Sequence, residues 1–232
     1  MKRFYAAARA EPCEGGYRVT LDGRPIRTQQ GAAQIVPGAA LAGALAAEWQ
    51  AQGEEIDPAM FRFRDMADYA IDHVRPGRGS MIDELLAYAE TDTLCYRADP
   101  DEPLHRRQRE VWEPLLAAIE AREGVRFERA SGVIHRPQPP ETLAHLRARL
   151  EALDDFTLAA LQPMASLAAS LTIALSALEP DADGSALWAA ASLEELWQAE
   201  QWGRDEAAEA RRARRQADFI AALEFARLAR AG

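Results

Sequence analysis

Cysteine is scarce in this chain of 232 residues, which contains only Cys13 and Cys95. Two cysteines so far apart in sequence predict neither a disulfide framework nor a thiolate zinc site, so we expect two free thiols. The four histidines never occur at the i, i+4 spacing that presents two metal ligands on one helix face. The sequence therefore indicates no metal site and no other cofactor.

Basic residues are in the minority, because 27 Lys and Arg stand against 37 Asp and Glu and leave a formal net charge of −10. This balance argues against nucleic acid as the main partner, since a phosphate backbone requires a basic footprint on the protein. The first residues, Met1–Tyr5, are followed neither by an apolar signal segment nor by an Arg-rich, acid-poor transit stretch. We therefore expect a cytoplasmic protein.

The common signatures of catalysis are also missing. No Gly-rich loop opens a helix after a strand, and no Gly-x-Ser-x-Gly elbow occurs. The carboxylate pairs at 54–55, 154–155 and 194–195 are immediate neighbours in sequence. Neighbours on a helix point about 100° apart and do not share a proton, so acid–base catalysis is not implied.

One long stretch, residues 156–178, contains no ionisable side chain. As a helix rising about 1.5 Å per residue, it is long enough to cross either a globular domain or a bilayer. Its many Ala, Ser and Thr residues make it only moderately apolar, and its flanks are acidic and lack the Lys/Arg bias of spanning helices. We therefore predict a buried central helix without stable membrane insertion, with Pro163 kinking it or marking its first turn.

The first forty residues are typical of a small antiparallel sheet. Residues 17–21 and 24–28 alternate polar and apolar side chains, and Asp22-Gly23 between them is a hairpin turn signal. A further strand is predicted over residues 33–36, and a helix over 39–52 is expected to cover one face, because such a sheet is not stable alone.

A second helical segment over 65–74 is followed by Pro76–Gly79, which interrupts the pattern and is the predicted domain boundary. Beyond it the periodicity predicts helices over 81–95, 104–122, 141–153, 156–178, 185–202 and 204–230. The predicted fold class is therefore α+β. A mixed α/β domain with a small antiparallel sheet covers residues 1–78, and a larger all-α domain with the central helix covers residues 79–232.

The predicted helix over 185–202 carries an unusual polar face. On a helical wheel its core-facing arc consists of Ala186, Ala189, Ala190, Leu193, Leu196 and Trp197. Trp188, Glu195 and Trp202 lie almost opposite this arc, with Glu194 and Gln198 on the flank. Exposed large aromatics mark interaction sites, and tryptophan is enriched where a few residues carry most of the binding energy. The alternative is a helix that is buried on two sides.

Several short motifs occur in an order and spacing similar to those of one known family: Lys2-Arg-Phe-Tyr5, Leu21-Asp-Gly-Arg-Pro25, Glu48-Trp49 with Gln52, Ile56-Asp-Pro58, Ile71-Asp72, Leu94-Cys-Tyr-Arg97, Trp112-Glu-Pro-Leu115, and Leu193-Glu-Glu195 with Gln198 and Trp202-Gly203. On these residues the chain resembles the assembly chaperone family of the F-type ATP synthase catalytic head, which acts on the alpha subunit in mitochondria and alphaproteobacteria. The resemblance covers almost the whole chain.

The resemblance implies a two-part molecule that is not an enzyme, and we expect it to be a monomer. Family members hold the newly made alpha subunit by the surface that it later gives to the beta subunit, and release it as beta takes over. A functionally sensitive acidic position of the family matches Leu193-Glu-Glu195. The predicted partner-binding residues are therefore Glu194, Glu195, Gln198, Trp202 and Trp188.

Two further positions can be compared with the family. Trp49 matches a sensitive tryptophan in its first helix, and we expect a structural role that locks the sheet to the helix. Phe61 stands where the family usually carries proline after methionine, which puts the local helix geometry in question. The absence of a mitochondrial presequence implies a bacterial member.

Two other functions remain open from the sequence. A carboxylate-dependent enzyme would require acids from separate helices to converge in a pocket, where burial would shift their pKa values. A generic helical interaction scaffold, with its tryptophans inside, would show no preference for one client.

Overall fold

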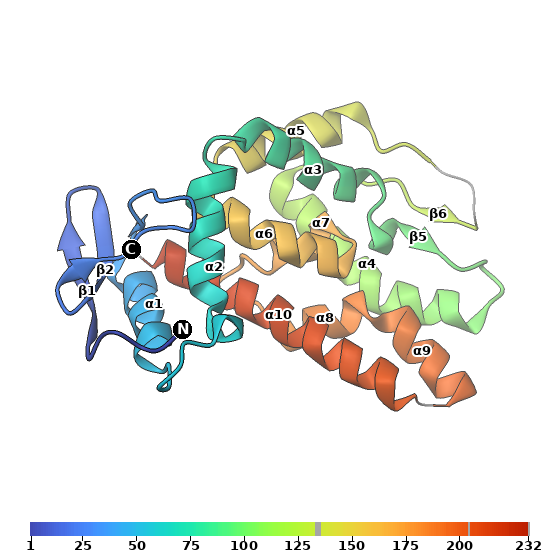
Figure 1. Ribbon diagram of the computed structural model, residues 1–232. Coiled ribbons are helices and arrows are strands. Elements are labelled where there is room, and N and C mark those ends of the chain that lie inside the picture. The colour runs from blue at the N-terminus through green and yellow to red at the C-terminus, as the bar shows by residue number, and fades with distance from the viewer. Residues whose placement is uncertain (133–135, 204, 232) are drawn as a thin grey trace. The chain divides into compact units, whose positions relative to one another are not determined.

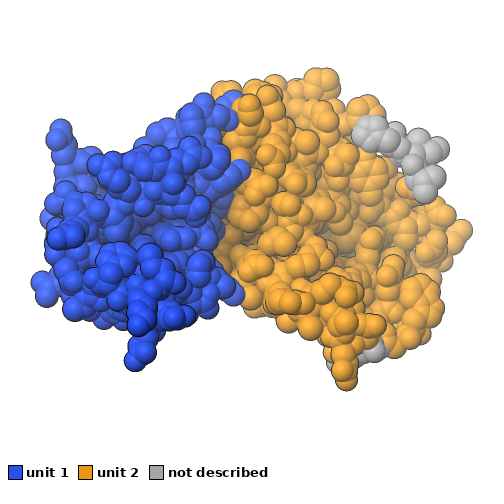
Figure 2. Space-filling view, viewed as in Figure 1, with its two compact units in different colours: residues 1–79, 154–160, 224–232 blue, residues 80–153, 161–223 orange. Residues whose placement is uncertain are grey.

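The computed structural model describes residues 1–132, 136–203 and 205–231 (Figure 1). Contacts divide the chain into two compact units, coloured separately in Figure 2. The first unit contains residues 1–79, 154–160 and 224–232, and the second contains residues 80–153 and 161–223. The boundary expected between residues 78 and 79 stays a prediction, and the first unit also includes two segments from later in the chain.

The first unit contains a four-stranded antiparallel sheet with β2 (Gly16–Leu21) at its centre. Strand β1 (Ala8–Cys13) pairs with one edge of β2, and the short strands β3 (Arg24–Pro25) and β4 (Ile35–Val36) pair with the other. The hairpin expected at Asp22-Gly23 is present and pairs Leu21 with Arg24. Gly16 has a positive φ of 143°, and a Cβ there would lie 2.3 Å from the Val36 carbonyl oxygen, so only glycine lets β4 approach.

Helix α1 (Ala39–Gln50) packs against β1 and β2, as Figure 1 shows, and buries Leu41, Leu45 and Trp49. The Trp49 ring lies between Tyr5 and Phe61, with ring centroids 5.7 and 4.5 Å away. The Tyr5 hydroxyl donates a 2.6 Å hydrogen bond to the Trp49 carbonyl oxygen. These contacts are of the kind that the predicted structural role of Trp49 requires.

A short 3-10 turn, η1 (Pro58–Met60), leads into helix α2 (Arg62–Tyr69), which continues as the π-helical turn η2 (Ala70–Val74). Carboxylates along this helix hold the loop that follows β3. Asp68 accepts hydrogen bonds from the Gln34 side chain at 2.5 Å and from the Gln29 backbone N–H at 3.2 Å. Asp72 accepts a 2.7 Å bond from the Thr28 hydroxyl.

Nearly all of the second unit is helical. Its main elements are α3 (Arg78–Glu90), α4 (Pro103–Glu123), α5 (Pro140–Glu151), α6 (Asp155–Ala168), α7 (Leu171–Ser176), α8 (Gly184–Ala191), α9 (Leu193–Trp202) and α10 (Glu206–Arg230), although the ends of α3, α6 and α10 belong to the first unit. A 3-10 turn, η3 (Thr93–Cys95), precedes β5 (Tyr96–Arg97), which pairs in parallel with β6 (Ala130–Ser131). The predicted α+β fold class is confirmed.

The central stretch is buried, as expected, but a single helix over 156–178 is a wrong prediction. Helix α6 ends at Ala168, and Ala169 takes a left-handed φ of 47°. Ser170 then caps α7 by accepting a 3.0 Å hydrogen bond from the Ile173 N–H. Pro163 lies inside α6, which starts at Asp155 and not at the proline.

Asp92 explains why the break is stable. This carboxyl is fully buried and accepts hydrogen bonds from the Thr172 N–H at 2.8 Å and from the Leu94 N–H at 3.1 Å. The N–H groups that a helix start leaves unpaired are thereby satisfied from a distant segment. Burial raises the pKa of Asp92 in spite of these donors. In the part of the chain that is described, no helix is both long and apolar enough to cross a membrane.

Candidate functional site

Helix α8 shows that only part of the predicted partner-binding face is exposed. Trp188 is 3% exposed, and its ring lies 5.8 Å from that of Phe219 on α10. The predicted core-facing arc is wrong within α8. Ala186 and Ala189 are exposed, whereas Gly184 and Leu187 are buried. The exposure predicted for Trp188 is therefore also wrong, and Trp188 belongs to the core of this unit.

Close packing against α10 fixes this orientation of α8. A Cβ on Gly184 would lie 2.6 Å from Ile220 Cδ1 and 3.0 Å from Leu223 Cδ1, so the first turn of α8 lies directly on α10. At the other end, the indole N–H of Trp112 on α4 donates a 2.8 Å hydrogen bond to the Ala190 carbonyl oxygen. Helix α8 is held on both sides by buried contacts.

The predicted continuous helix over 185–202 is broken at Ser192, which has φ −93° and ψ 10°. Helix α9 starts at the next residue in a new direction, so a wheel drawn through both helices gives wrong faces for the first one. Within α9, however, Glu195, Gln198 and Trp202 are spaced three and four residues apart and share one face. Trp202 is 80% exposed.

Polar contacts attach α9 to α4 and α10. Glu194 accepts a 2.7 Å hydrogen bond from the side chain of Gln108, which is fully buried on α4. Glu200 accepts two hydrogen bonds from the Arg107 guanidinium, at 2.8 and 3.0 Å. Glu195 lies 3.8 Å from Arg215 on α10. Of the predicted residues, the structure therefore brings Glu194, Glu195, Gln198 and Trp202 together on α9 and leaves Trp188 out.

The basic segment that includes Arg215, the partner of Glu195, was not predicted from the sequence. Residues 211–215, Arg-Arg-Ala-Arg-Arg, form a basic run in an acidic chain, and Arg211, Arg214 and Arg215 are exposed on α10. Arg215 also lies over the Trp188 ring at 5.4 Å and donates a 2.8 Å hydrogen bond to the Leu167 carbonyl oxygen. The charge pattern alone was the signal that could have found them.

The α9 surface, defined as Glu194, Glu195, Gln198 and Trp202, is suited to binding rather than to reaction. It offers one large exposed aromatic ring, two carboxylates and one amide. Among the described residues, no group of three or more His, Cys, Asp or Glu side chains is placed to hold a metal ion. A partner with an apolar side chain for Trp202 and basic groups for the glutamates would complement this surface.

Comparison with known proteins assigns the chain to a family. The sequence profile of the ATP12 chaperone protein family matches residues 2–120. The crystal structure of Atp12 from Paracoccus denitrificans, and that of a mutant of the same protein, superpose with a TM-score of 0.94 at 39% identity, covering 99% of this chain and 98% of theirs.

A third solved structure gives the same result. Atu1473, a putative chaperone from Agrobacterium tumefaciens, superposes with a TM-score of 0.93 at 38% identity over 97% of this chain and 85% of its own. The resemblance that the sequence motifs indicated is confirmed by these findings. The chain belongs to the ATP12 chaperone family.

Proposed function

We propose that this protein binds the unassembled alpha subunit of the F-type ATP synthase and shields its beta-facing interface until the beta subunit takes over. Membership in the ATP12 chaperone family supports a chaperone role, and the motif resemblance described above supplies the client. The observation that carries the choice of site is Trp202, a large aromatic side chain left 80% exposed beside two glutamates.

An unassembled subunit exposes apolar surface that promotes aggregation, and covering it requires an apolar anchor with a polar rim. On the α9 surface Trp202 is the anchor, and Glu194, Glu195 and Gln198 are the rim. A single exposed tryptophan limits the affinity, which suits a site that must be vacated when the next subunit arrives. Release then follows because the chaperone and the beta subunit compete for one surface of the client.

A role without catalysis agrees with membership in a chaperone family. Three carboxyl groups have pKa values that burial raises, Glu48, Asp68 and Asp92. Each of them accepts hydrogen bonds from backbone N–H groups: Glu48 from Phe63 and Arg64 at 2.7 and 2.8 Å, and the other two as described above. Burial raises these pKa values against the opposing effect of the hydrogen bonds, and the hydrogen bonds give each carboxyl a structural role in the fold.

The test is light scattering of purified alpha subunit warmed with this protein. We expect wild type to suppress aggregation, and Trp202→Ala to bind the alpha subunit roughly 30-fold more weakly, the effect of losing about 2 kcal/mol at a binding hot spot. Glu195→Lys should weaken binding as well, because it places a like charge against the basic side chains expected on the client. Titration calorimetry measures both affinities directly.

Matched controls lie in the first unit, which does not contain α9. Met60 is another exposed apolar side chain, and Glu14 is an exposed glutamate in the β1–β2 turn, so Met60→Ala and Glu14→Lys should behave like wild type. An unrelated aggregation-prone protein tests selectivity. Equal protection of both clients, unaffected by the α9 variants, would replace the proposal with a generic scaffold.

A further inference from the structure

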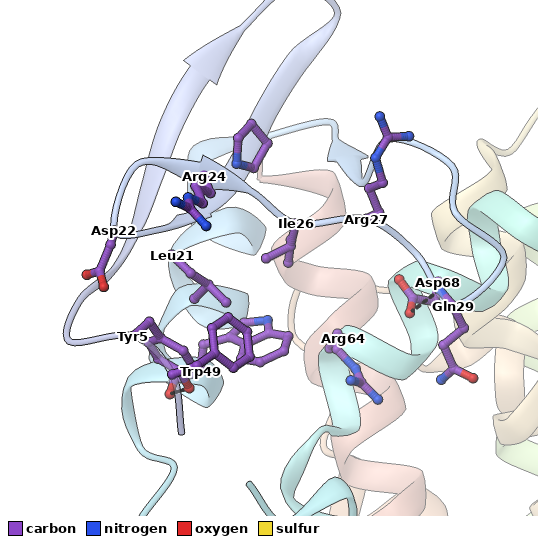
Figure 3. Close-up of a pocket in the computed structure, with 12 residues that line it drawn as sticks. Tyr5, Leu21, Asp22, Arg24, Ile26, Arg27, Gln29, Trp49, Arg64 and Asp68 are labelled. Carbon is purple, nitrogen blue, oxygen red and sulfur yellow. Dashed lines mark hydrogen bonds between the residues drawn. The ribbon is translucent and has the colours of Figure 1, made fainter. Parts of the chain in front are cut away.

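A second candidate site lies in the first unit. Its residues lie between positions 4 and 68, far from α9 in the sequence. A pocket of about 570 Å³ opens between the sheet, α1 and α2 (Figure 3). It is lined by Phe4, Tyr5, Leu21, Asp22, Arg24, Pro25, Ile26, Arg27, Gln29, Trp49, Arg64 and Asp68. This volume is within the range of pockets that bind small ligands or single side chains with their neighbouring backbone.

One part of the pocket is apolar and well packed. Tyr5, Leu21 and Trp49 are buried, and the Tyr5 and Trp49 rings meet edge to face with their centroids 5.7 Å apart. Phe4 stands at the rim with 64% of its surface exposed and contacts Tyr5 edge to face. The exposed Phe4 and the buried rings form a continuous aromatic lining that an apolar side chain would cover.

Trp49 also carries an unused hydrogen-bond donor. Its indole Nε1 is buried and has no hydrogen-bond partner among the described residues. Buried donors without a partner are uncommon because each costs roughly 1–3 kcal/mol. The Trp49 ring is therefore a lining residue with an unsatisfied polar atom buried behind its exposed edge.

The other part of the pocket is positively charged. Arg24 and Arg27 come from β3 and the residues directly after it, and Arg64 comes from α2; Figure 3 shows Arg27 and Arg64 on the side away from Asp22. The two acids are already engaged: Asp22 accepts hydrogen bonds from the backbone N–H groups of Ala6 and Ala7, and Asp68 is held by Gln29 and Gln34.

The three arginines differ in how many of their side-chain N–H donors already have a partner. Arg64 is paired with Asp65 and lies 4.0 Å over the Phe61 ring, so it has a structural role. Arg27 donates one 2.8 Å bond to the Gly31 carbonyl oxygen. The Arg24 side chain makes no hydrogen bond or ion pair with any described residue, although its charge contributes to the lowered pKa of Asp22. It therefore has its full donor capacity available for an anionic ligand.

We propose that this pocket binds a short peptide segment in which an aromatic or bulky aliphatic side chain stands next to a carboxylate. The apolar side chain covers the rings of Phe4, Tyr5 and Trp49, and the carboxylate pairs with Arg24. A polypeptide is favoured over a free metabolite because the chain belongs to a family of proteins that bind other proteins. The inference goes beyond the proposed function, since it requires neither the alpha subunit nor α9.

The test is fluorescence anisotropy with fluorescein-labelled peptides of sequence Gly-Phe-Asp-Gly, Gly-Phe-Asn-Gly and Gly-Ala-Asp-Gly added to the full chain. We expect the first to bind at least about tenfold more tightly than either of the others, because each lacks one of the two required groups. Arg24→Gln and Phe4→Ala should each weaken it by a similar factor. Arg9→Gln, at an exposed arginine on β1 outside the pocket, should not.

A second readout locates the bound peptide. In a ¹⁵N spectrum the indole signal of Trp49, assigned by its loss in Trp49→Phe, should shift on addition of Gly-Phe-Asp-Gly while the other indole signals stay in place. Equal binding of all three peptides, equal binding by Arg24→Gln, or an unmoved Trp49 signal would each overturn the proposal. Equal binding of Gly-Ala-Asp-Gly and Gly-Phe-Asp-Gly, with weaker binding of Gly-Phe-Asn-Gly, would also overturn the proposal, because the pocket would then be an anion site without selectivity for the apolar side chain. The assay contains no ATP synthase subunit, so its failure leaves the proposed function untouched.

Discussion

Helices α8 and α9 are consecutive in the chain and both contain tryptophan, yet α8 buries Trp188 and α9 exposes Trp202. The contacts around them explain the difference. Helix α8 lies on α10 through Gly184 and Trp188, whereas α9 is attached mainly by side-chain hydrogen bonds and ion pairs from Glu194, Glu195 and Glu200. Apolar burial stabilises the fold in one helix, and in the other an apolar side chain remains available for binding.

The largest expected effect tests this difference between α8 and α9 directly. Trp188→Ala removes a buried aromatic ring and should lower the free energy of unfolding by about 3–5 kcal/mol, as large-to-small core substitutions do. Trp202→Ala should change it by less than about 0.5 kcal/mol, because the ring is exposed. Urea unfolding measures both. Equal losses in the two variants would mean that Trp202 is also part of the folded core, and the comparison of the two helices would fail.

Gln108 is the buried end of the attachment of α9, and its removal should have the next largest effect. Its Oε1 accepts a 2.8 Å hydrogen bond from the Ala98 N–H, and its Nε2 donates to Glu194. Gln108→Leu leaves the Ala98 N–H unpaired and should cost about 1–3 kcal/mol. Gln198→Leu, an exposed glutamine on α9, is the matched control and should cost almost nothing. Hydrogen exchange should show faster opening of α9 in Gln108→Leu, with α8 unchanged.

The helix breaks and strand β1 are the parts of the fold that were not predicted from the sequence. Hydrophobic periodicity correctly predicted the sheet hairpin, the position of almost every helix and the burial of the central stretch. It missed the breaks at Ala169 and Ser192, because neither position carries the glycine or proline that usually marks a helix end. The break at Ala169 depends on Asp92, which lies far away in the sequence, and a periodic pattern contains no information about that contact.

The candidate site was predictable to the same extent. Glu195, Gln198 and Trp202 lie within one helix, where spacing determines the shared face, and they were correctly grouped. Trp188 was misplaced because its position on the wheel assumed that the helix continued through Ser192. The pocket around Trp49 was not foreseen at all, since its lining combines β-turn, strand and helix residues that only the tertiary fold brings together.

The two breaks differ in backbone conformation, which gives a prediction of opposite sign at each. Ala169 has a left-handed φ of 47°, which costs a non-glycine residue roughly 1 kcal/mol, so Ala169→Gly should stabilise the protein by up to that amount. Ser192 has an ordinary negative φ of −93°, so Ser192→Gly should destabilise it by about 0.5–1 kcal/mol. Thermal unfolding compares the two, and a loss of stability in Ala169→Gly would contradict the strain assigned to that residue.

The smallest expected effect concerns salt. Arg107 and Glu200 are both more than 40% exposed, and such a pair contributes about 0.5 kcal/mol. Raising the ionic strength to about 1 M shortens the screening length to about 3 Å, so hydrogen exchange in α9 should speed up about twofold while α8, held by buried contacts, should not respond. Arg107→Gln should speed α9 exchange at low salt and reduce its remaining salt response to that of the Glu195–Arg215 pair. If salt accelerated exchange in α8 as much as in α9, the attachment of the two helices would not differ in kind.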